Sequence, residues 1–196
     1  MNEVMTNKTP RVYAFIDSQN LNLGTQKFGW KMNWQKFRKF LEDKYGVTKA
    51  FMFIGYVPEF EDMYERLRES GYAIVLKPTY DMTRPREETT KPEAEDKKPV
   101  KGNIDAELVL WTMKEINNYD KAIIVSGDGD FYCIVEYLHE QGKLLKLMVP
   151  SPHYSSLFNR FESYIENIYQ YRRQLAYRDS RKFRKKPARE RNTTNP

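Results

Sequence analysis

The ten residues AIIVSGDGDF at positions 122–131 join a short apolar run to a glycine-rich acidic turn. An apolar run of this length, without polar alternation, is typical of a strand that is covered on both faces of a sheet. Four further runs of the same kind occur along the chain, with helical spacing between them. We expect strands at residues 12–16, 50–57, 72–76, 122–125 and 144–149.

The segments between these runs space their apolar residues as helices do. Gly46, Gly71 and Gly142 stand where three of these helices should end. Strands that alternate with helices form a parallel sheet with right-handed crossovers. The sequence therefore predicts an α/β fold with helices on both faces of a mostly parallel sheet. The helices are expected at residues 33–45, 60–70, 103–117, 131–141 and 155–176.

The length of 196 residues suits one domain, which we place at residues 11–176. Residues 1–10 are polar and lack the apolar stretch of a signal peptide, so we expect a flexible N-terminal segment. Residues 81–101 are rich in charge and proline and predict an exposed loop. No apolar run approaches the roughly 20 residues of a membrane span. With Cys133 as the single cysteine, a reducing cytoplasm is the expected location.

The positive charge is concentrated near the C-terminus. The chain has 33 basic and 27 acidic residues, and residues 172–191 hold ten of the bases with only two acids. Tyr177 and Phe183 interleave with these bases as groups on which a nucleic-acid base could stack. We therefore predict that residues 177–196 form a disordered basic tail that binds a polyanion, most often nucleic acid. A solvated, solubilising tail is the alternative.

Four carboxylates follow strand ends or begin a helix. Asp17 follows the first strand, Asp128 and Asp130 follow the fourth, and Asp105 lies in the first turn of the helix that leads into the fourth. The carboxyl ends of parallel strands meet at one edge of a sheet, where ligands bind. Each acid alone could simply cap a helix or favour its dipole. Together they repel one another, which favours a hard divalent cation, Mg²⁺ or Mn²⁺, that orients water against a phosphodiester.

Four motifs in a fixed order carry a family resemblance: FIDSQNL (15–21), KGNID (101–105), VSGDGDF (125–131) and VPSPHYSSL (149–157). With them the sequence resembles the NYN domains, relatives of the PIN nucleases, and most of all their bacterial LabA/DUF88 branch. The resemblance implies a three-layer PIN-like sandwich whose five-stranded sheet has the order 3-2-1-4-5. It also implies a metal-dependent ribonuclease. We predict that its RNA substrate is single-stranded.

The resemblance also assigns roles to acidic positions. The family's catalytic acids fall on Asp17, Asp105, Asp128 and Asp130. Asp17 and Asp128 would bind Mg²⁺ or Mn²⁺ directly, and Asp105 and Asp130 directly or through water.

Three further residues complete the expected site. The family's amide after the first strand falls on Asn20, which would hold a ligand carboxylate or donate to a phosphate oxygen. Its small hydroxyl residue falls on Ser126, which would donate to the phosphate or orient Asp17. Lys101 would pair with the scissile phosphate or neutralise Asp105.

Other functions are compatible with the same residues. The domain could bind RNA in a regulatory role while it turns over slowly or not at all. Another phosphoryl enzyme with carboxylates and a metal is less suited: a haloacid-dehalogenase phosphatase needs a second acid two positions after Asp17, where Gln19 stands, and no P-loop motif occurs. The sequence leaves the oligomeric state open, a homodimer included.

Overall fold

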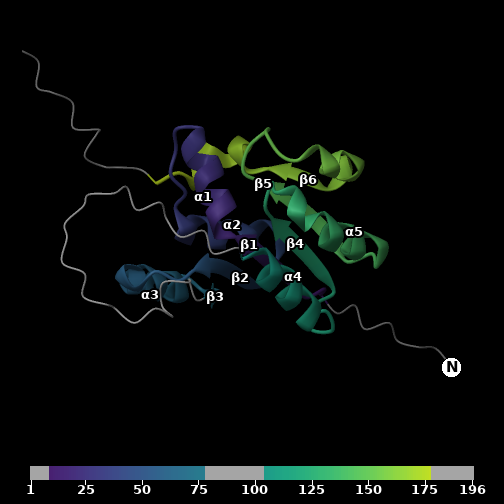
Figure 1. The fold of residues 1–196 in the computed structure, drawn as a ribbon, viewed down its shortest axis with the longest axis horizontal. Coiled ribbons are helices and arrows are strands. Elements are labelled where there is room, and N and C mark those ends of the chain that lie inside the picture. The colour runs from purple at the N-terminus through teal and green to yellow at the C-terminus, as the bar shows by residue number, and fades with distance from the viewer. Residues whose placement is uncertain (1–8, 78–103, 178–196) are drawn as a thin grey trace, which may run out of the picture.

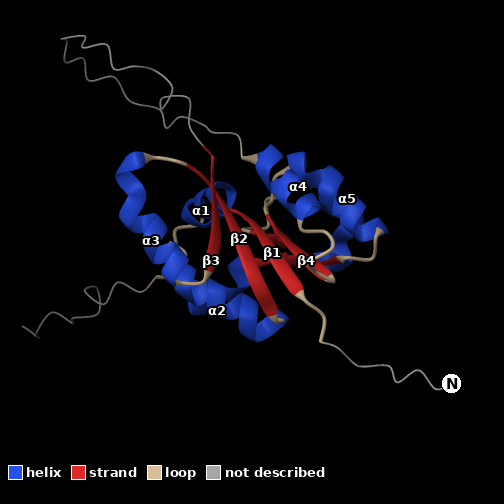
Figure 2. Ribbon diagram, turned by 90° about the horizontal axis from the view of Figure 1, so that it is seen from below, coloured by secondary structure: helices blue, strands red, loops and turns tan. Residues whose placement is uncertain are grey.

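The computed structural model describes residues 9–77 and 104–177. Six parallel strands form one twisted sheet in the order β3-β2-β1-β4-β5-β6 (Figures 1 and 2). The α/β class and the order 3-2-1-4-5 are confirmed, and a sixth strand extends the sheet. The strands are β1 (Val12–Asp17), β2 (Val47–Gly55), β3 (Tyr72–Lys77), β4 (Lys121–Val125), β5 (Leu144–Val149) and β6 (Ile165–Asn167).

Helices cover both faces of this sheet and complete three layers (Figure 2). One face packs against α1 (Ser18–Lys27), α2 (Trp34–Tyr45), α3 (Glu61–Glu69) and α6 (Arg172–Leu175). The other face packs against α4 (Asp105–Lys114) and α5 (Tyr132–Glu140). Short 3₁₀ helices at Pro58–Phe60, Gly129–Phe131, Ser156–Tyr164 and Ile168–Tyr171 connect these elements.

The central strands are apolar throughout because each face of the sheet has its own core. Along β1, Ala14 and Ile16 pack into the core beneath α1 and α2. Phe15 points to the opposite core, where its ring stacks on Phe51 of β2 with the centroids 5.3 Å apart. Side chains alternate between the two faces of a strand, so a strand buried on both sides needs apolar residues at every position.

The helix predicted at residues 155–176 is wrong. The structure has two 3₁₀ helices there, with β6 between them and the short α6 at the end. Phe158 and Phe161 are both buried, and the backbone kinks at Phe161, where its angles are not helical. Ile165 pairs with Leu147, so β6 satisfies backbone groups along β5 that would otherwise lie at an open edge.

Helix α1 was not among the predicted helices. Only Leu21 and Thr25 of its ten residues are buried, so its apolar periodicity is too weak to see in the sequence. Strand β2 also begins three residues earlier than predicted, at Val47. Its start follows from the pairing of Val47 with Val12, a contact that local pattern does not contain.

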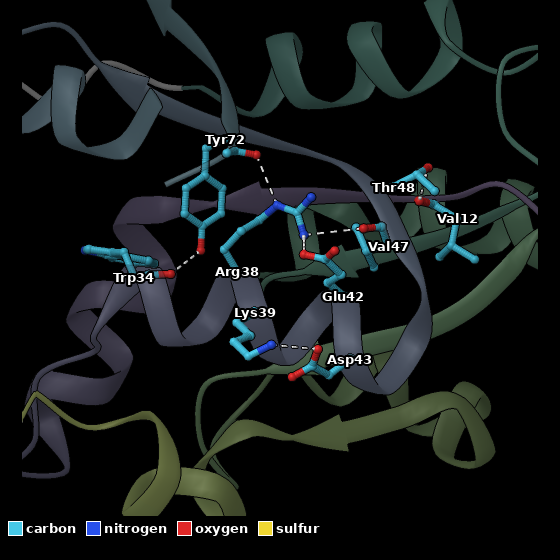
Figure 3. Close-up of polar contacts among 10 residues, drawn as sticks. Val12, Trp34, Arg38, Lys39, Glu42, Asp43, Val47, Thr48 and Tyr72 are labelled. Carbon is cyan, nitrogen blue, oxygen red and sulfur yellow. Dashed lines mark hydrogen bonds and ion pairs between the residues drawn. The ribbon is translucent and has the colours of Figure 1, made fainter. Parts of the chain in front are cut away.

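A half-buried arginine, Arg38, joins α2 to the amino ends of β2 and β3 (Figure 3). Nε of Arg38 donates to the Gly71 carbonyl at 3.0 Å, and Nη1 donates to the Val47 carbonyl at 3.3 Å. The Tyr72 hydroxyl donates to the Trp34 carbonyl at 2.7 Å. These contacts hold α2 at the amino-terminal edge of the sheet, opposite to the carboxyl edge where Asp17 lies.

Several predictions from the sequence concern residues that the structure does not describe. The exposed loop at 81–101, including Lys101, the first eight residues and the basic tail beyond Tyr177 lie outside the described residues. Across the two described ranges, the helices are all too short or too polar to traverse a lipid bilayer.

Candidate active site

The register of β1 and β4 brings Asp17 beside Ser126. Ile16 pairs with Val125, so the next residue of each strand emerges at the same level of the carboxyl edge. The Ser126 hydroxyl donates to Oδ2 of Asp17 at 3.2 Å. Both side chains are buried, Asp17 being only 4% exposed. The predicted convergence of the ends of the first and fourth strands is therefore present.

Asp17 also caps helix α1. Its Oδ1 accepts the backbone N–H of Asn20 at 3.0 Å, which is the usual hydrogen bond of an N-cap side chain. Each carboxylate oxygen thus has a donor, one from its own helix and one from Ser126. The Asp17 carboxylate is held in a single orientation by two elements.

Asn20 ties α1 to the acidic turn. Its Oδ1 accepts the N–H of Gly127 at 2.9 Å, which orients the Nδ2 group away from that backbone. Within residues 9–77 and 104–177, Nδ2 has no hydrogen-bond partner. Asn20 is half-buried at this edge of the sheet.

The two acids of the turn have different environments. Asp128 is half-buried and caps the 3₁₀ helix Gly129–Phe131 by accepting the N–H of Asp130 at 3.1 Å. The Asp128 N–H in turn donates to the Ser126 hydroxyl at 3.1 Å. Asp130 is exposed and does not cap the next helix as one interpretation had it, because that helix, α5, begins at Tyr132 after Phe131.

A loop after β5 packs directly on the acidic turn, and glycines make the approach close. The Ser155 N–H donates to the Gly127 carbonyl at 3.0 Å. A Cβ at Gly129 would lie 2.5 Å from the Ser155 hydroxyl, and one at Gly24 of α1 would lie 2.6 Å from two atoms of Pro150. The sequence reasoning missed Gly24, whose signal was an isolated glycine inside a polar stretch of helical length.

The buried Asp17 carboxylate lies within the electrostatic influence of other acids of the site. The pKa of Asp17 is raised to about 6, chiefly by burial and also by the charges of Asp105 and Asp128, while the hydrogen bonds from Asn20 and Ser126 lower it. Asp105 is half-buried in the first turn of α4, which lies against the 3₁₀ helix of the acidic turn. Two elements, α4 through Asp105 and the acidic turn through Asp128, thus bring negative charge to Asp17.

The carboxylates do not form a ready-made cage for a metal ion. In the described ranges, no group of three or more acidic, histidine or cysteine side chains is arranged to hold an ion. The ion pairs found within the same ranges involve neither Asp17 nor Asp128. The donors are all hard oxygens, the type that Mg²⁺ and Mn²⁺ prefer. The ligand set expected from the sequence remains a prediction.

The fold, a parallel α/β sheet in the order 3-2-1-4-5-6 with helices on both faces and acids at its carboxyl edge, matches that of a PIN-like domain. Residues 11–185 match the NYN domain, and the chain belongs to this family, which is of the nuclease type. The assignment to the LabA/DUF88 branch stays a prediction.

One solved structure supports the fold. A crystal structure of a protein of unknown function from Vibrio parahaemolyticus superposes with a TM-score of 0.59 and 20% sequence identity, covering 83% of this chain and 93% of that one. At this identity the likeness concerns the fold alone. No curated protein matches the sequence significantly.

Proposed function

We propose that this protein is a metal-dependent ribonuclease that hydrolyses RNA phosphodiester bonds at the carboxyl edge of the sheet. The observation that carries the proposal is the buried carboxylate of Asp17, whose pKa is raised by burial and by the charges of Asp105 and Asp128. Membership of a nuclease-type family supports the same reaction.

The capping role of Asp17 does not account for its charge. Asn and Ser cap helices about as well as Asp, and neither brings a charge into a buried position. A carboxylate that is buried beside two other acids destabilises the fold unless something positive binds there. Strongly perturbed carboxylates of this kind are concentrated at functional sites.

The donor set suits a hydrated divalent ion. Mg²⁺ usually binds through one or two carboxylates and keeps several waters, so a site without three clustered protein ligands is compatible with it. Asp17 and Asp128 would hold Mg²⁺ or Mn²⁺, with Asp105 and Asp130 contributing directly or through water. When bound, the ion would supply positive charge to the phosphodiester and its leaving oxygen.

The neighbouring side chains position these acids and the substrate. Ser126 keeps Asp17 and the backbone of Asp128 in a fixed relation through its two hydrogen bonds. The Nδ2 group of Asn20 would donate to a phosphate oxygen, and Lys101 would pair with the scissile phosphate or with Asp105.

Single-stranded RNA is the proposed substrate, and residues 177–196 would add affinity through their positive charge. Binding of basic side chains to phosphates releases counterions, so affinity should fall steeply as salt rises. Removal of residues 178–196 should flatten that dependence and spare the cleavage of a short oligonucleotide.

The proposal is tested by incubating labelled single-stranded RNA, and DNA of the same sequence, with the protein and Mg²⁺ or Mn²⁺. We expect cleavage of RNA that is abolished by a chelator and by Asp17→Asn or Asp128→Asn. Asp43→Asn, a substitution on the surface of α2, serves as the matched control and should cleave normally. Wild-type rates in either site variant would refute the nuclease. Retention of RNA without product under every metal would favour the regulatory RNA-binding module instead.

A further inference from the structure

Four flat side chains from distant parts of the sequence form a continuous ladder beside α1. The rings of His153 and Phe28 stack with centroids 5.5 Å apart and planes 25° apart, and Phe28 contacts Tyr169 at 5.5 Å with the planes tilted by 59°. The guanidinium of Arg172 lies 4.4 Å from the centre of the Tyr169 ring. Figure 1 shows the C-terminal segment that carries Tyr169 and Arg172 running alongside α1. We call these four side chains the ring ladder.

The ring ladder differs from the aromatic pairs of the core. Phe15 and Phe51 stack while fully buried, which is packing alone. In the ring ladder, Phe28 and Tyr169 are half-buried and His153 is exposed. Among the described residues, Phe28 is the one ring that His153 contacts. The ladder therefore ends on an accessible aromatic ring.

The exposed end of the ladder belongs to the loop that packs on the acidic turn. The His153 N–H donates to the Ser151 hydroxyl at 3.2 Å, which fixes the loop between Pro150 and Ser155. Ser155 of the same loop bonds to the Gly127 carbonyl. The ladder thus starts next to the proposed catalytic edge and leads away from it to Arg172.

Positive charge accompanies the ladder. Lys27 and Lys31 are exposed on either side of Phe28 along the chain, and Arg172 closes the far end. No acidic side chain is a member. A row of rings that ends on a guanidinium matches a single-stranded nucleic acid, whose bases stack on aromatic rings and whose phosphates attract Arg.

We propose that the ring ladder is a subsite for single-stranded RNA outside the catalytic edge, with one base stacked on His153 and the phosphate backbone passing Arg172. The assignment of RNA rests on the proposed function. The stacking itself needs only an unpaired base, so duplex RNA should not use this subsite.

The test measures binding of a short labelled single-stranded RNA by fluorescence anisotropy, with Asp128→Asn as the parent so that the RNA stays intact. Adding His153→Ala should weaken binding about ten-fold, the effect of losing one base–aromatic stack. His153→Phe should bind as the parent does, because it keeps a ring. His139→Ala is the matched control: His139 is also exposed and packs on rings, Phe161 and Tyr164, but lies on α5 away from the ladder.

Equal affinities for His153→Ala and His139→Ala would overturn the ring-ladder subsite. If the wild-type chain still cleaves RNA in that case, the nuclease stands and only the subsite falls. Absence of both cleavage and binding in the wild-type chain would reject the proposed function itself. Tighter binding of single-stranded DNA than of RNA to the parent would overturn RNA as the occupant. Thermal unfolding of each variant checks that the ring substitutions leave the fold intact.

Discussion

The hydroxyl of Ser126 lies 3.2 Å from the carboxylate of Asp17, although 109 residues separate the two in the chain. The same hydroxyl oxygen accepts the N–H of Asp128 at 3.1 Å. Ser126 is therefore the link that keeps an acid from β1 and an acid from the turn after β4 in one arrangement. Because Ser126 is buried, a water molecule could take the place of its hydroxyl group only if the surrounding structure changed.

Replacing Ser126 by Ala should reduce RNA cleavage by about ten-fold or more, because Asp17 loses a donor and the Asp128 N–H loses its acceptor. Each lost buried hydrogen bond should lower the free energy of unfolding by about 1 kcal/mol. The matched control is Ser18→Ala, whose hydroxyl donates to the Phe53 carbonyl at 2.7 Å and touches neither acid. With one hydrogen bond lost instead of two, it should lose about half as much stability and keep its activity. Equal activity of the two variants would show that Ser126 has no role in the site.

Replacing Asp17 by Asn should stabilise the metal-free protein at neutral pH. The folded-state pKa of Asp17 is about 6, above the roughly 3.9 of an unfolded chain, so protonation favours the folded state. That stability is fully present below about pH 4 and is lost as the pH rises through about 6. Asn keeps the cap and carries no charge, so Asp17→Asn should gain on the order of 3 kcal/mol over wild type at pH 7.

Denaturant unfolding at a series of pH values between about 4 and 8, in a chelator, measures this difference. The gap between wild type and Asp17→Asn should close as the pH falls to about 4. Asp43→Asn, on the exposed face of α2, should follow wild type throughout. A gap that stays constant over this range would mean that Asp17 is not a titrating buried acid.

Mg²⁺ or Mn²⁺ should raise the unfolding temperature of the wild-type protein and should have no such effect on Asp17→Asn. An ion that binds the folded state alone stabilises it by about 2.7 kcal/mol when its concentration is a hundred times the dissociation constant. A thermal shift titration at neutral pH measures this without any substrate. Equal shifts in both proteins would place the ion somewhere other than Asp17.

Replacing Gly24 by Ala should destabilise the protein, although Ala is the better helix former by about 1 kcal/mol. The new Cβ would lie 2.6 Å from Cβ and Cγ of Pro150, and a proline ring cannot turn away. Overpacking of this kind costs about 1–3 kcal/mol, which outweighs the gain in helix propensity. Gln19→Ala, at an exposed position of the same helix, should show no loss in chemical denaturation. A more stable Gly24→Ala protein would contradict the contact between α1 and the loop after β5.

Replacing Arg38 by Met should lower the free energy of unfolding by about 1 kcal/mol, since the exposed carbonyl of Gly71 and the partly buried carbonyl of Val47 lose their donor (Figure 3). Its neighbour Lys39 pairs with Asp43 on the surface, with 75% of its side chain exposed, so Lys39→Met should change stability little. Both variants should cleave RNA at the wild-type rate once folded, because Arg38 lies at the opposite sheet edge. Equal stabilities in urea would show that the Arg38 contacts contribute nothing.

Much of the fold was predictable because its strands are covered on both faces. Residues 12–16 and 122–125 had to be apolar at every position, and that pattern is visible in the sequence without knowing the neighbours. The acids that follow them were predictable as a group, since parallel strands end at one edge. Helix α1 and strand β6 were not. Helix α1 has only a weak apolar face among its polar residues. Strand β6 exists only through its pairing with β5.

By itself, the sequence determined which segments are strands of a two-sided sheet, and it predicted that Asp17, Asp105, Asp128 and Asp130 lie at one edge of it. Tertiary structure alone decided that Asp17 is buried with a raised pKa, that Gly24 must be small against Pro150, and that His153 stacks on Phe28. The physical reason is that local periodicity reports which face of an element is covered. Burial, pKa and stacking depend instead on the identity of the contacting residue. That residue can lie more than a hundred positions away in the chain, as Ser126 does from Asp17.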